Sequence, residues 1–545
     1  MYHRRNFNPT VLMTFRALPL VLVLHASAVA LAECTPTSSS RASAAADWTS
    51  WGGDAHNTRY RSAAAAGVSA ANVTRLELAW AYNLGPITDA RGQPILAGST
   101  LYVGTPTGDV LALDARSGCL RWRFHADGGV HAAVAVAHDV VIIADQKANA
   151  YALDAATGTL RWRVHLDDHI TARVTGSPQI ANGVAYIPLS SFEEVMALAP
   201  KYECCTFRGS VVALDVASGR QRWKTYTVPD SSRPTTVAPS GVQRRGPSGA
   251  AIWSSPTIDA ARGLLYVATG NNYSDPATST SDAVIAMNLS DGAIRWTKQL
   301  TTNDAENVGC DIPGKPMCPT ADGPDADFGQ PPMLTTTPSG RPLLVLAQKS
   351  GIAYALDPEK RGEIVWQTRV GKGGRLGGSQ WGSASDSRYA YVATSDLQLR
   401  TVPDSTPQGF HLEPDPTHGG GLTAIDLATG RVHWTAPPVL ACGTRKRCAP
   451  SQSAAVTAID GVVFSGALDG HLRAYSATNG KVLWDFDAVR PFDTVEGATA
   501  HGGSFDANGV TIARGMLFVS SGYGLWGGTP GNVFLAFSVR GHDRR

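Results

Sequence analysis

The sequence predicts an all-β protein, an eight-bladed β-propeller closed by pairing of its N- and C-terminal strands. Short runs rich in Val, Ala, Tyr and Thr alternate with turns in a chain of 545 residues that contains 56 glycines. This pattern is typical of a large antiparallel β protein. A strand–turn–strand unit ending in tryptophan recurs along the chain, and one further unit is divided between the two termini.

The recurrent unit is a β-hairpin. Each copy has an apolar run, a turn rich in polar residues and glycine, and a second run that ends in tryptophan, as in "VLALDARSGCLRW" and "AYALDAATGTLRW". A further apolar run precedes each hairpin, such as "STLYVGTP" or "GVAYIPLS". Repeats of about 40 residues with tryptophan at a fixed place indicate a propeller, and we expect the tryptophans to pack between blades. The seven complete units end at Trp122, Trp162, Trp223, Trp296, Trp366, Trp434 and Trp484.

The eighth unit is split between the ends of the chain. The runs "GMLFVSSG" and "GNVFLAFSV" near the C-terminus lack a closing tryptophan, and "LELAW", which ends in Trp80, lacks the strands before it. Joined, these segments form one complete blade, so we expect Trp80 to share a sheet with residues 534–538. Closing the ring in this way removes the exposed sheet edges through which β proteins aggregate.

The N-terminus has the pattern of a secretory signal. Arg4, Arg5 and Arg16 precede the apolar run Ala17–Leu24, and Ala30-Leu31-Ala32 is a small-x-small cleavage pattern. A membrane anchor is the alternative, but a helix needs about 20 apolar residues to span a bilayer and this apolar run is shorter. The sequence therefore divides into a signal peptide, residues 1–32, and a propeller, residues 33–545. We expect the mature protein to be periplasmic, where disulfides form.

The charge balance argues against two classes of partner. Only 17% of the residues are Asp, Glu, Lys or Arg, and the formal net charge is +2. Binding to nucleic acid or to a membrane surface depends on clustered positive charge, so we expect neither partner. No segment after the signal is apolar enough to span a membrane.

The middle blades carry insertions. A minimal blade needs about 40 residues, and the intervals between the repeat tryptophans from Trp162 to Trp434 are all longer than the two that precede them. Long loops on a rigid scaffold are the usual place for functional residues. The search for a site therefore starts in these blades.

Polar side chains follow the strands of the inserted blades. Glu193 and Glu194 come after "IPLSS", Asn271 follows "LYVATG", and Asp325 and Asp327 lie in "GPDADFG". Carboxylate and amide oxygens are hard ligands, which suit calcium rather than zinc. Each residue also has an ordinary structural explanation, as a solvated loop carboxylate or a turn-forming asparagine, and spacing alone leaves both explanations open.

The order of these motifs resembles that of the quinoprotein alcohol dehydrogenases. "WGGDAHNTRY" is followed by "SSFEE", by "IWSSP" with Trp253, by "ATGN", by "DADFG" and by "QKSG" with Lys349. "YECCTFRGSVVALD" and "FGQPPML" are similar to the polyvinyl-alcohol dehydrogenase group of this family. The resemblance covers nearly all of the chain after the signal. It implies a propeller that holds pyrroloquinoline quinone (PQQ) and a calcium or lanthanide ion.

The resemblance also implies roles for single residues. Trp253 resembles the tryptophan on which the flat quinone stacks, and Lys349 resembles the basic residue that hydrogen-bonds the quinone oxygens. Glu194, or Glu193 if the register differs by one, resembles the metal-binding glutamate. Asn271 resembles the metal-binding asparagine.

Asp327 resembles the catalytic aspartate of the family, which also lies at the metal. In this role it takes the hydroxyl proton of the alcohol as general base, while the ion polarises a quinone carbonyl as a Lewis acid. Asp325, two residues earlier, is the alternative base.

Cys204 and Cys205 are adjacent in the sequence. A disulfide between neighbours closes the shortest possible loop, so it stabilises the fold little through chain entropy. In the family that the sequence resembles, an adjacent-cysteine disulfide lies over the quinone, opposite the tryptophan, and the resemblance implies this role for Cys204–Cys205. The alternative is a buried or metal-binding pair without contact to the quinone.

The other cysteines bear on structure and on the electron acceptor. Cys310 with Cys318, and Cys442 with Cys448, each bracket a short segment that a disulfide would close. No C-x-x-C-H motif is present, so no covalently attached haem is expected. Electrons are then expected to leave to a separate acceptor, for which we predict an external cytochrome c.

The resemblance thus implies a PQQ-dependent dehydrogenase of secondary alcohols, with polyvinyl alcohol as the favoured substrate. One alternative is a dehydrogenase for another alcohol, polymeric or small, or for a sugar. The other is a non-catalytic propeller that binds proteins, which would share the tryptophan repeats but would not need Trp253, Asn271, Asp327 or the adjacent cysteines.

Overall fold

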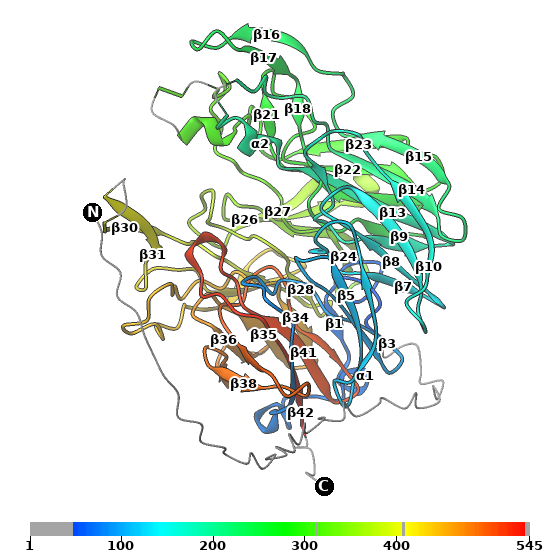
Figure 1. Ribbon diagram of the computed structural model, residues 1–545, viewed down its shortest axis with the longest axis vertical. Coiled ribbons are helices and arrows are strands. Elements are labelled where there is room, and N and C mark those ends of the chain that lie inside the picture. The colour runs from blue at the N-terminus through cyan, green and yellow to red at the C-terminus, as the bar shows by residue number, and fades with distance from the viewer. Residues whose placement is uncertain (1–46, 200, 312–313, 316, 406–408, 540–545) are drawn as a thin grey trace, which may run out of the picture. The chain divides into compact units, whose positions relative to one another are not determined.

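The described part of the chain contains eight sheets of four or five mainly antiparallel strands (Figure 1). The computed structural model describes residues 47–199, 201–311, 314–315, 317–405 and 409–539. The predicted signal peptide, residues 1–32, lies outside the described residues. The sheets follow one another in chain order, as expected for the blades of a propeller. The predicted fold class is confirmed.

The first four sheets come from the N-terminal half of the chain. Blade 1 contains β3 (Ile95–Ala97), β4 (Thr100–Gly104), β5 (Asp109–Asp114) and β6 (Leu120–His125). Blade 2 contains β7 (Ala135–Ala137), β8 (Val140–Ala144), β9 (Asn149–Asp154) and β10 (Leu160–His165). Blade 3 contains β11 (Ala172–Arg173), β12 (Gln179–Ala181), β13 (Val184–Ser191), β14 (Ser210–Asp215) and β15 (Gln221–Tyr226). Blade 4 contains β19 (Thr257–Asp259), β20 (Leu264–Ala268), β22 (Ala283–Asn288) and β23 (Ile294–Gln299).

The other four sheets complete the set. Blade 5 contains β24 (Met333–Thr336), β25 (Pro342–Ala347), β26 (Ile352–Asp357) and β27 (Glu363–Arg369). Blade 6 contains β28 (Ala384–Ser385), β29 (Tyr389–Ala393), β32 (Leu422–Asp426) and β33 (Val432–Ala436). Blade 7 contains β34 (Thr457–Ile459), β35 (Val462–Gly466), β36 (His471–Ser476) and β37 (Val482–Asp487), with β1 (Tyr60–Arg61) added in parallel to β34. Blade 8 contains β2 (Glu77–Asn83), β40 (Thr511–Ala513), β41 (Met516–Ser521) and β42 (Val533–Ser538).

Small hairpins and single helical turns lie outside the blades. The hairpin pairs are β16 (Arg233–Val237) with β17 (Gln243–Gly246), β18 (Ser248–Gly249) with β21 (Asn272–Ser274), β30 (Leu399–Pro403) with β31 (Phe410–Pro414), and β38 (Pro491–Asp493) with β39 (Thr499–His501). The helical turns are α1 (Ala63–Ala66), α2 (Glu193–Met196), η2 (Val73–Arg75), η3 (Val308–Asp311), η4 (Pro358–Lys360) and η5 (Leu525–Gly527). No helix in the described part of the chain is long and apolar enough to cross a bilayer.

Blade 8 is built from both ends of the described chain. Strand β2 pairs with β42, and the register places Trp80 opposite Ala536 and Tyr82 opposite Phe534. In Figure 1 the red C-terminal strands accordingly lie beside the blue N-terminal segment. The predicted split blade is therefore confirmed, and the ring is closed by ordinary antiparallel pairing.

The repeat tryptophans link neighbouring blades. The indole Nε1 of Trp80 in blade 8 donates to the carbonyl of Ala115 in blade 1 at 3.2 Å. The equivalent bond from Trp484 in blade 7 reaches the carbonyl of Leu76, next to β2, at 3.1 Å. Each such bond fixes one blade against the next, because a buried indole N–H needs an acceptor.

The same contact explains a glycine in the hairpin turn. Gly118 in blade 1 has a φ of 73°, and a Cβ added there would lie 2.7 Å from the Trp80 ring. Gly158 stands in the same relation to Trp122, also at 2.7 Å. Only glycine combines the left-handed backbone with so close an approach of the indole.

Three disulfides are present in the described residues. They join Cys310 to Cys318, Cys442 to Cys448, and Cys204 to Cys205. The first two close the small loops that their spacing predicts.

We predict that Trp80→Ala lowers the free energy of unfolding by about 3–5 kcal/mol, because it empties a buried site between blades 8 and 1 and loses the bond to Ala115. Trp80 is 6% exposed. Trp526→Ala is the matched control, since Trp526 is 61% exposed and its loss should change the free energy of unfolding by about 0.5 kcal/mol or less. Denaturant unfolding followed by circular dichroism measures both. Equal losses in the two variants would contradict the structural role of Trp80.

Candidate active site

One cavity of about 690 Å³ gathers most of the predicted site residues. A volume of this order is usual for a small-molecule or cofactor site. Its wall includes residues from the loops of blades 3, 4 and 5, which carry the insertions. The predicted residues on the wall are Glu194, Trp253, Asn271, Asp327 and Lys349. Glu193, Cys204, Cys205 and Asp325 are not among the residues that line it.

Trp253 presents a half-buried indole ring to the cavity. It makes an edge-to-face contact with Trp381, with ring centroids 5.5 Å apart and an interplanar angle of 89°. A Cβ added at Gly329 would lie 2.5 Å from the ring. Any larger residue at this position would therefore collide with the indole. The ring is thus fixed and offers a flat apolar surface, which suits a planar aromatic ligand.

Lys349 lies between two carboxylates. Its Nζ is 2.7 Å from Oδ2 of Asp327 and 2.9 Å from Oδ1 of Asp325. It also lies 5.4 Å from the centroid of the Trp253 ring. The ammonium group therefore links the carboxylate on the cavity wall, the carboxylate behind it and the aromatic surface.

The two carboxylates differ in their proton affinity. Burial alone would raise the pKa of Asp327, but the charge of Lys349 and the N–H of Asn271 hold it below its usual value. Burial and the nearby Asp327 carboxylate raise the pKa of Asp325 well above its usual value, although Lys349 opposes this. Neighbouring carboxylates around one cation commonly divide in this way, with one ionised and one protonated.

Asn271 is held at both of its nitrogen atoms. Its backbone N–H donates to Oδ1 of Asp327 at 2.7 Å, and its Nδ2 donates to the carbonyl of Glu306 at 3.0 Å. The side-chain oxygen is then the atom left for a ligand in the cavity. Gly270, just before it, also lies against the Asp327 carboxylate, where a Cβ would collide.

Glu194 has a different environment from Glu193. Its carboxylate lines the cavity and accepts no hydrogen bond from the residues that the structure describes. Burial, together with the charge of Asp327, raises the pKa of Glu194 to about 7. A cation between the carboxylates of Glu194 and Asp327 would favour the ionised form of both.

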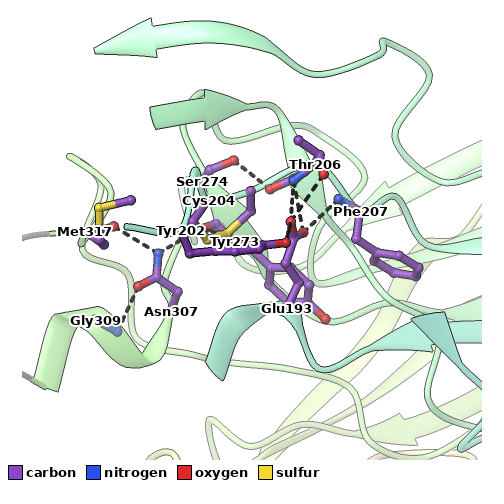
Figure 2. Close-up of a disulfide and its surroundings, with 12 residues drawn as sticks. Glu193, Tyr202, Cys204, Thr206, Phe207, Tyr273, Ser274, Asn307, Gly309 and Met317 are labelled. Carbon is purple, nitrogen blue, oxygen red and sulfur yellow. Dashed lines mark hydrogen bonds between the residues drawn. A yellow bond between two sulfur atoms is a disulfide. The ribbon is translucent and has the colours of Figure 1, made fainter. Parts of the chain in front are cut away.

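Glu193 is fully buried and points away from the cavity. Figure 2 shows its carboxylate against the backbone of the next loop. The N–H groups of Thr206 and Phe207 donate to it at 2.8 and 2.7 Å, and the Tyr202 hydroxyl at 2.9 Å. Despite burial, these bonds and His169 keep the pKa of Glu193 below its usual value. Glu193 therefore anchors the loop that follows the cysteines.

The Cys204–Cys205 disulfide lies one layer behind the wall. Cys204 and Cys205 are 2% and 0% exposed and belong to an apolar cluster with Phe207 and Tyr273. Their backbone pairs with Arg245 of β17 at 2.8 and 3.0 Å. The Sγ of Cys205 is 3.8 Å from the carbonyl of Tyr273, a residue that does line the cavity (Figure 2).

The cavity wall offers a set of ligands that fits a hard cation. Glu194 and Asp327 supply carboxylate oxygens and Asn271 supplies an amide oxygen, as calcium sites require. The support for this fit is the Glu194 carboxylate, which has no donor from the described chain, and the Asn271 amide, whose nitrogen is already fixed.

Sequence reasoning missed four cationic or imidazole residues on the wall, namely Arg91, His131, Arg173 and Arg375. Burial, together with nearby arginines, lowers the pKa of His131 to about 3, so this imidazole is neutral. Only Arg375, in the glycine-rich loop "GKGGRLGG", carries a recognisable sequence signal. The arginines make this wall suitable for an anionic ligand.

A second layer of carboxylates supports the Asp325–Asp327 loop. The carboxylate of Asp304 accepts the N–H of Asp325 at 3.3 Å and that of Ala326 at 2.7 Å. Asp282 is fully buried beside it, and burial and the charge of Asp304 raise the pKa of Asp282 well above its usual value. The Asp325–Asp327 loop is therefore held from behind by a buried acid pair.

Two family models match the chain. One, described as "Outer membrane protein assembly factor BamB", matches residues 64–245 and 348–501. The other, described as "Glucose/ethanol/alcohol dehydrogenase, beta-propeller domain", matches residues 195–372. The second match contains Asn271, Asp327 and Lys349.

Relatives that match most of the chain show which of the two descriptions applies. The polyvinylalcohol dehydrogenase of Pseudomonas sp is 40% identical over 515 residues, which cover 91% of this chain and 77% of that protein. The polyvinylalcohol dehydrogenase of Sphingopyxis sp. (strain 113P3) is 36% identical over 521 residues, with the same shares covered. The chain belongs to the polyvinylalcohol dehydrogenases, a group of PQQ-dependent alcohol dehydrogenases. The alternative of a propeller that only binds proteins is thereby excluded.

Solved structures of dehydrogenases share the fold. The quinohemoprotein alcohol dehydrogenase of Comamonas testosteroni superposes with a TM-score of 0.66 at 20% identity, covering 91% of this chain and 81% of that chain. A europium-containing methanol dehydrogenase gives a TM-score of 0.66 at 18% identity, covering 90% of this chain and 98% of that chain. At these identities the likeness concerns the fold alone.

We predict that Asp282→Asn stabilises this dehydrogenase at pH 8 and not at pH 4. The pKa of an aspartate in the unfolded chain is about 3.9, and the folded value is higher. The folded protein therefore keeps a proton that the unfolded chain releases, and the free energy of unfolding falls as pH rises from about 4 through the folded pKa. The variant cannot lose this proton, so its advantage should grow with pH to about 1–3 kcal/mol. Thermal unfolding from pH 4 to 8 measures it.

Asp230→Asn is the control, because Asp230 is an exposed aspartate. Its substitution should leave the pH profile of unfolding parallel to that of the wild type. An Asp282→Asn profile that also runs parallel to the wild type would show that Asp282 is ionised in the folded protein.

Proposed function

We propose that this dehydrogenase oxidises secondary alcohols, with polyvinyl alcohol as substrate, by means of PQQ and a calcium or lanthanide ion. The observation that carries the proposal is the Asp327 carboxylate on the cavity wall, bonded to Lys349 and to the N–H of Asn271 beside the Trp253 ring. The named activity of relatives that are 40% and 36% identical supports the choice of substrate.

Trp253, Lys349 and the wall arginines are proposed to bind the cofactor. PQQ is a flat quinone that carries three carboxylates, so it would stack on the indole of Trp253 and use Arg91 or Arg173 as counter-charges. When bound, PQQ accepts two electrons and the carbinol hydrogen of the alcohol, while the metal ion polarises its carbonyl. Glu194, Asn271 and Asp327 are the proposed ligands of the ion.

Asp327 is proposed as the base that receives the hydroxyl proton. It lines the cavity, whereas Asp325 does not, and a base must come within hydrogen-bond distance of the proton. Its depressed pKa keeps it ionised and therefore able to accept. Lys349 orients its Oδ2 and balances its charge before the proton arrives. Asp325 remains the alternative because it is bonded to the same Lys349 Nζ, although its raised pKa favours the protonated form, which cannot accept a proton.

The contribution of the cysteine pair is proposed to be indirect. Cys204 and Cys205 do not line the cavity, so direct contact with the quinone is not part of the proposal. Glu193 binds the residues after the pair and stands next to Glu194. The disulfide loop would then fix the backbone from which Glu194 projects.

A periplasmic compartment and an external electron acceptor are also part of the proposal. The basic and apolar N-terminal segment with its Ala30-Leu31-Ala32 pattern supports export to the periplasm. The absence of a C-x-x-C-H motif in the sequence supports a separate cytochrome c as acceptor.

Reconstitution tests the proposed function. The mature protein is incubated with PQQ and calcium, then assayed by dye reduction with polyvinyl alcohol, propan-2-ol, ethanol and a sugar alcohol. We expect the secondary alcohols to be oxidised, and the polymer among them. Activity confined to primary alcohols or sugars would replace the proposed substrate. Repeating the reconstitution with a lanthanide in place of calcium shows which ion supports activity.

We predict that Asp327→Asn lowers kcat about a hundredfold to ten-thousandfold, because an amide cannot accept the alcohol proton. PQQ should still bind, which its absorbance in the reconstituted protein will show. Asp325→Asn is the matched control, since it removes the other carboxylate on Lys349 and should keep most of the rate. The reverse outcome would make Asp325 the base.

We predict that Glu194→Gln weakens calcium binding about tenfold or more, because the site loses an anionic ligand. Glu193→Gln should instead destabilise the folded protein by about 1–3 kcal/mol, since an amide cannot satisfy all the donors that the buried carboxylate accepts. Calcium titration of bound PQQ and thermal unfolding separate the two effects. Equal losses of calcium affinity would show that Glu193 also binds the ion.

A further inference from the structure

Three apolar side chains at the cavity are exposed to solvent. Phe192 is 44% exposed, Leu525 42% and Trp526 61%, and all three line the cavity. Phe192 follows β13 in blade 3, and the other two form η5 between β41 and β42 of blade 8. We call these residues the apolar mouth. Exposed apolar groups gathered at one cavity usually mark a binding surface.

The backbone of Trp526 has a positive φ angle. Its φ is 46° and its ψ is 30°, the left-handed region that bulky side chains rarely adopt. A residue in this conformation lowers the stability of the fold. Because Trp526 is 61% exposed, burial of its ring within the fold stabilises the protein little. Strain of this kind is generally kept where the side chain has a function.

The turn that carries Trp526 is held in place from both sides. Arg447 donates from Nε to the carbonyl of Gly528 and from a terminal guanidinium nitrogen to the carbonyl of Gly524, both at 2.8 Å. The N–H of Gly524 donates to Thr88 at 2.8 Å. The indole is therefore presented on a fixed turn, so little order has to be gained when a ligand binds.

Phe192 is fixed in a similar way on the other contributing blade. The guanidinium of Arg173 lies 4.4 Å from the centroid of its ring, a cation–π contact. Glu193 and Glu194 follow it directly in α2. The mouth is thus continuous with the wall that carries Glu194.

We propose that the apolar mouth binds the hydrocarbon backbone of a polymeric alcohol next to the hydroxyl that is oxidised. The proposal rests on the proposed function and adds the subsite that distinguishes a polymer from a small alcohol. A vinyl-alcohol chain alternates methylene groups with hydroxyl-bearing carbons. Its methylenes gain by leaving water for the faces of Trp526 and Phe192, and its hydroxyls can use the indole N–H and the polar wall.

A small alcohol has no chain to reach this surface. Propan-2-ol would meet only the deep groups around Asp327, which is 7% exposed. The mouth should therefore affect KM for the polymer and leave both kinetic constants for propan-2-ol unchanged.

The test compares Trp526→Ala with the wild type on the two substrates, as the PQQ- and calcium-loaded enzyme with a dye acceptor. We expect KM for polyvinyl alcohol to rise about tenfold, the usual effect of losing one aromatic anchor, with kcat for propan-2-ol unchanged. Trp526→Phe should keep most of the affinity for the polymer. Leu440→Ala is the control, since Leu440 is 66% exposed and does not line the cavity.

Binding without turnover gives a second readout. Polyvinyl alcohol added to the enzyme should change the tryptophan fluorescence, and the change should be smaller in Trp526→Phe. In a series of vinyl-alcohol oligomers, KM for the wild type should fall with chain length, and this fall should be weaker in Trp526→Ala.

The outcomes are distinguishable. If the wild type oxidises neither alcohol, the proposed function fails. If it oxidises both and Trp526→Ala alters neither, or alters both equally, the mouth does not bind the polymer. A loss that is the same for both alcohols and occurs only with a cytochrome c acceptor would assign this surface to that protein and overturn the inference. Failure of Trp526→Phe to retain affinity would also overturn it.

Discussion

The pairing of β2 with β42 is the constraint on which the rest of the structure depends. It completes blade 8 from the two ends of the chain, and the indole bonds then run from Trp484 to Leu76 and from Trp80 to Ala115 across the closure. A closed ring leaves no sheet edge to fray. Because every blade is fixed by its two neighbours, the loops at the cavity can carry groups that cost stability, such as buried carboxylates and a tryptophan with positive φ.

The charges at the site illustrate this cost. Lys349 serves two carboxylates, and only Asp327 faces the cavity. A buried charge is tolerable when it is paired and hydrogen-bonded, and here the pairing also sets which carboxylate is ionised. The acid pair Asp282–Asp304 behind the loop has no comparable cation in the ion pairs of the described residues. The pair fixes the backbone of Asp325 and Ala326. Its burial lowers the stability of the fold, and the packing of the closed ring offsets this loss.

The adjacent residues Glu193 and Glu194 have different environments. Glu193 is bound by the loop that carries the cysteine pair, and Glu194 faces the cavity without a donor. The short helix α2 explains the difference, since successive side chains of a helical turn point in different directions. The same turn begins next to Phe192, so one segment contributes an apolar group to the mouth, a carboxylate to the wall and an anchor to the core. One short segment of blade 3 therefore supplies side chains to the mouth, the wall and the core.

The sequence by itself determined the propeller, its eight blades, the split closure and the inter-blade tryptophans, because these depend on local alternation and on a repeat that is visible in one chain. The resemblance of its ordered motifs to a known family also predicted Trp253, Asn271, Asp327 and Lys349 as site residues, and all four line one cavity. Only the tertiary structure decided that Glu194 rather than Glu193 faces the cavity, that Cys204 and Cys205 lie behind the wall, and that the arginines and Trp526 line it. Those features depend on where long loops fold back against other blades. No local pattern encodes such contacts, since their partners lie far away in the sequence.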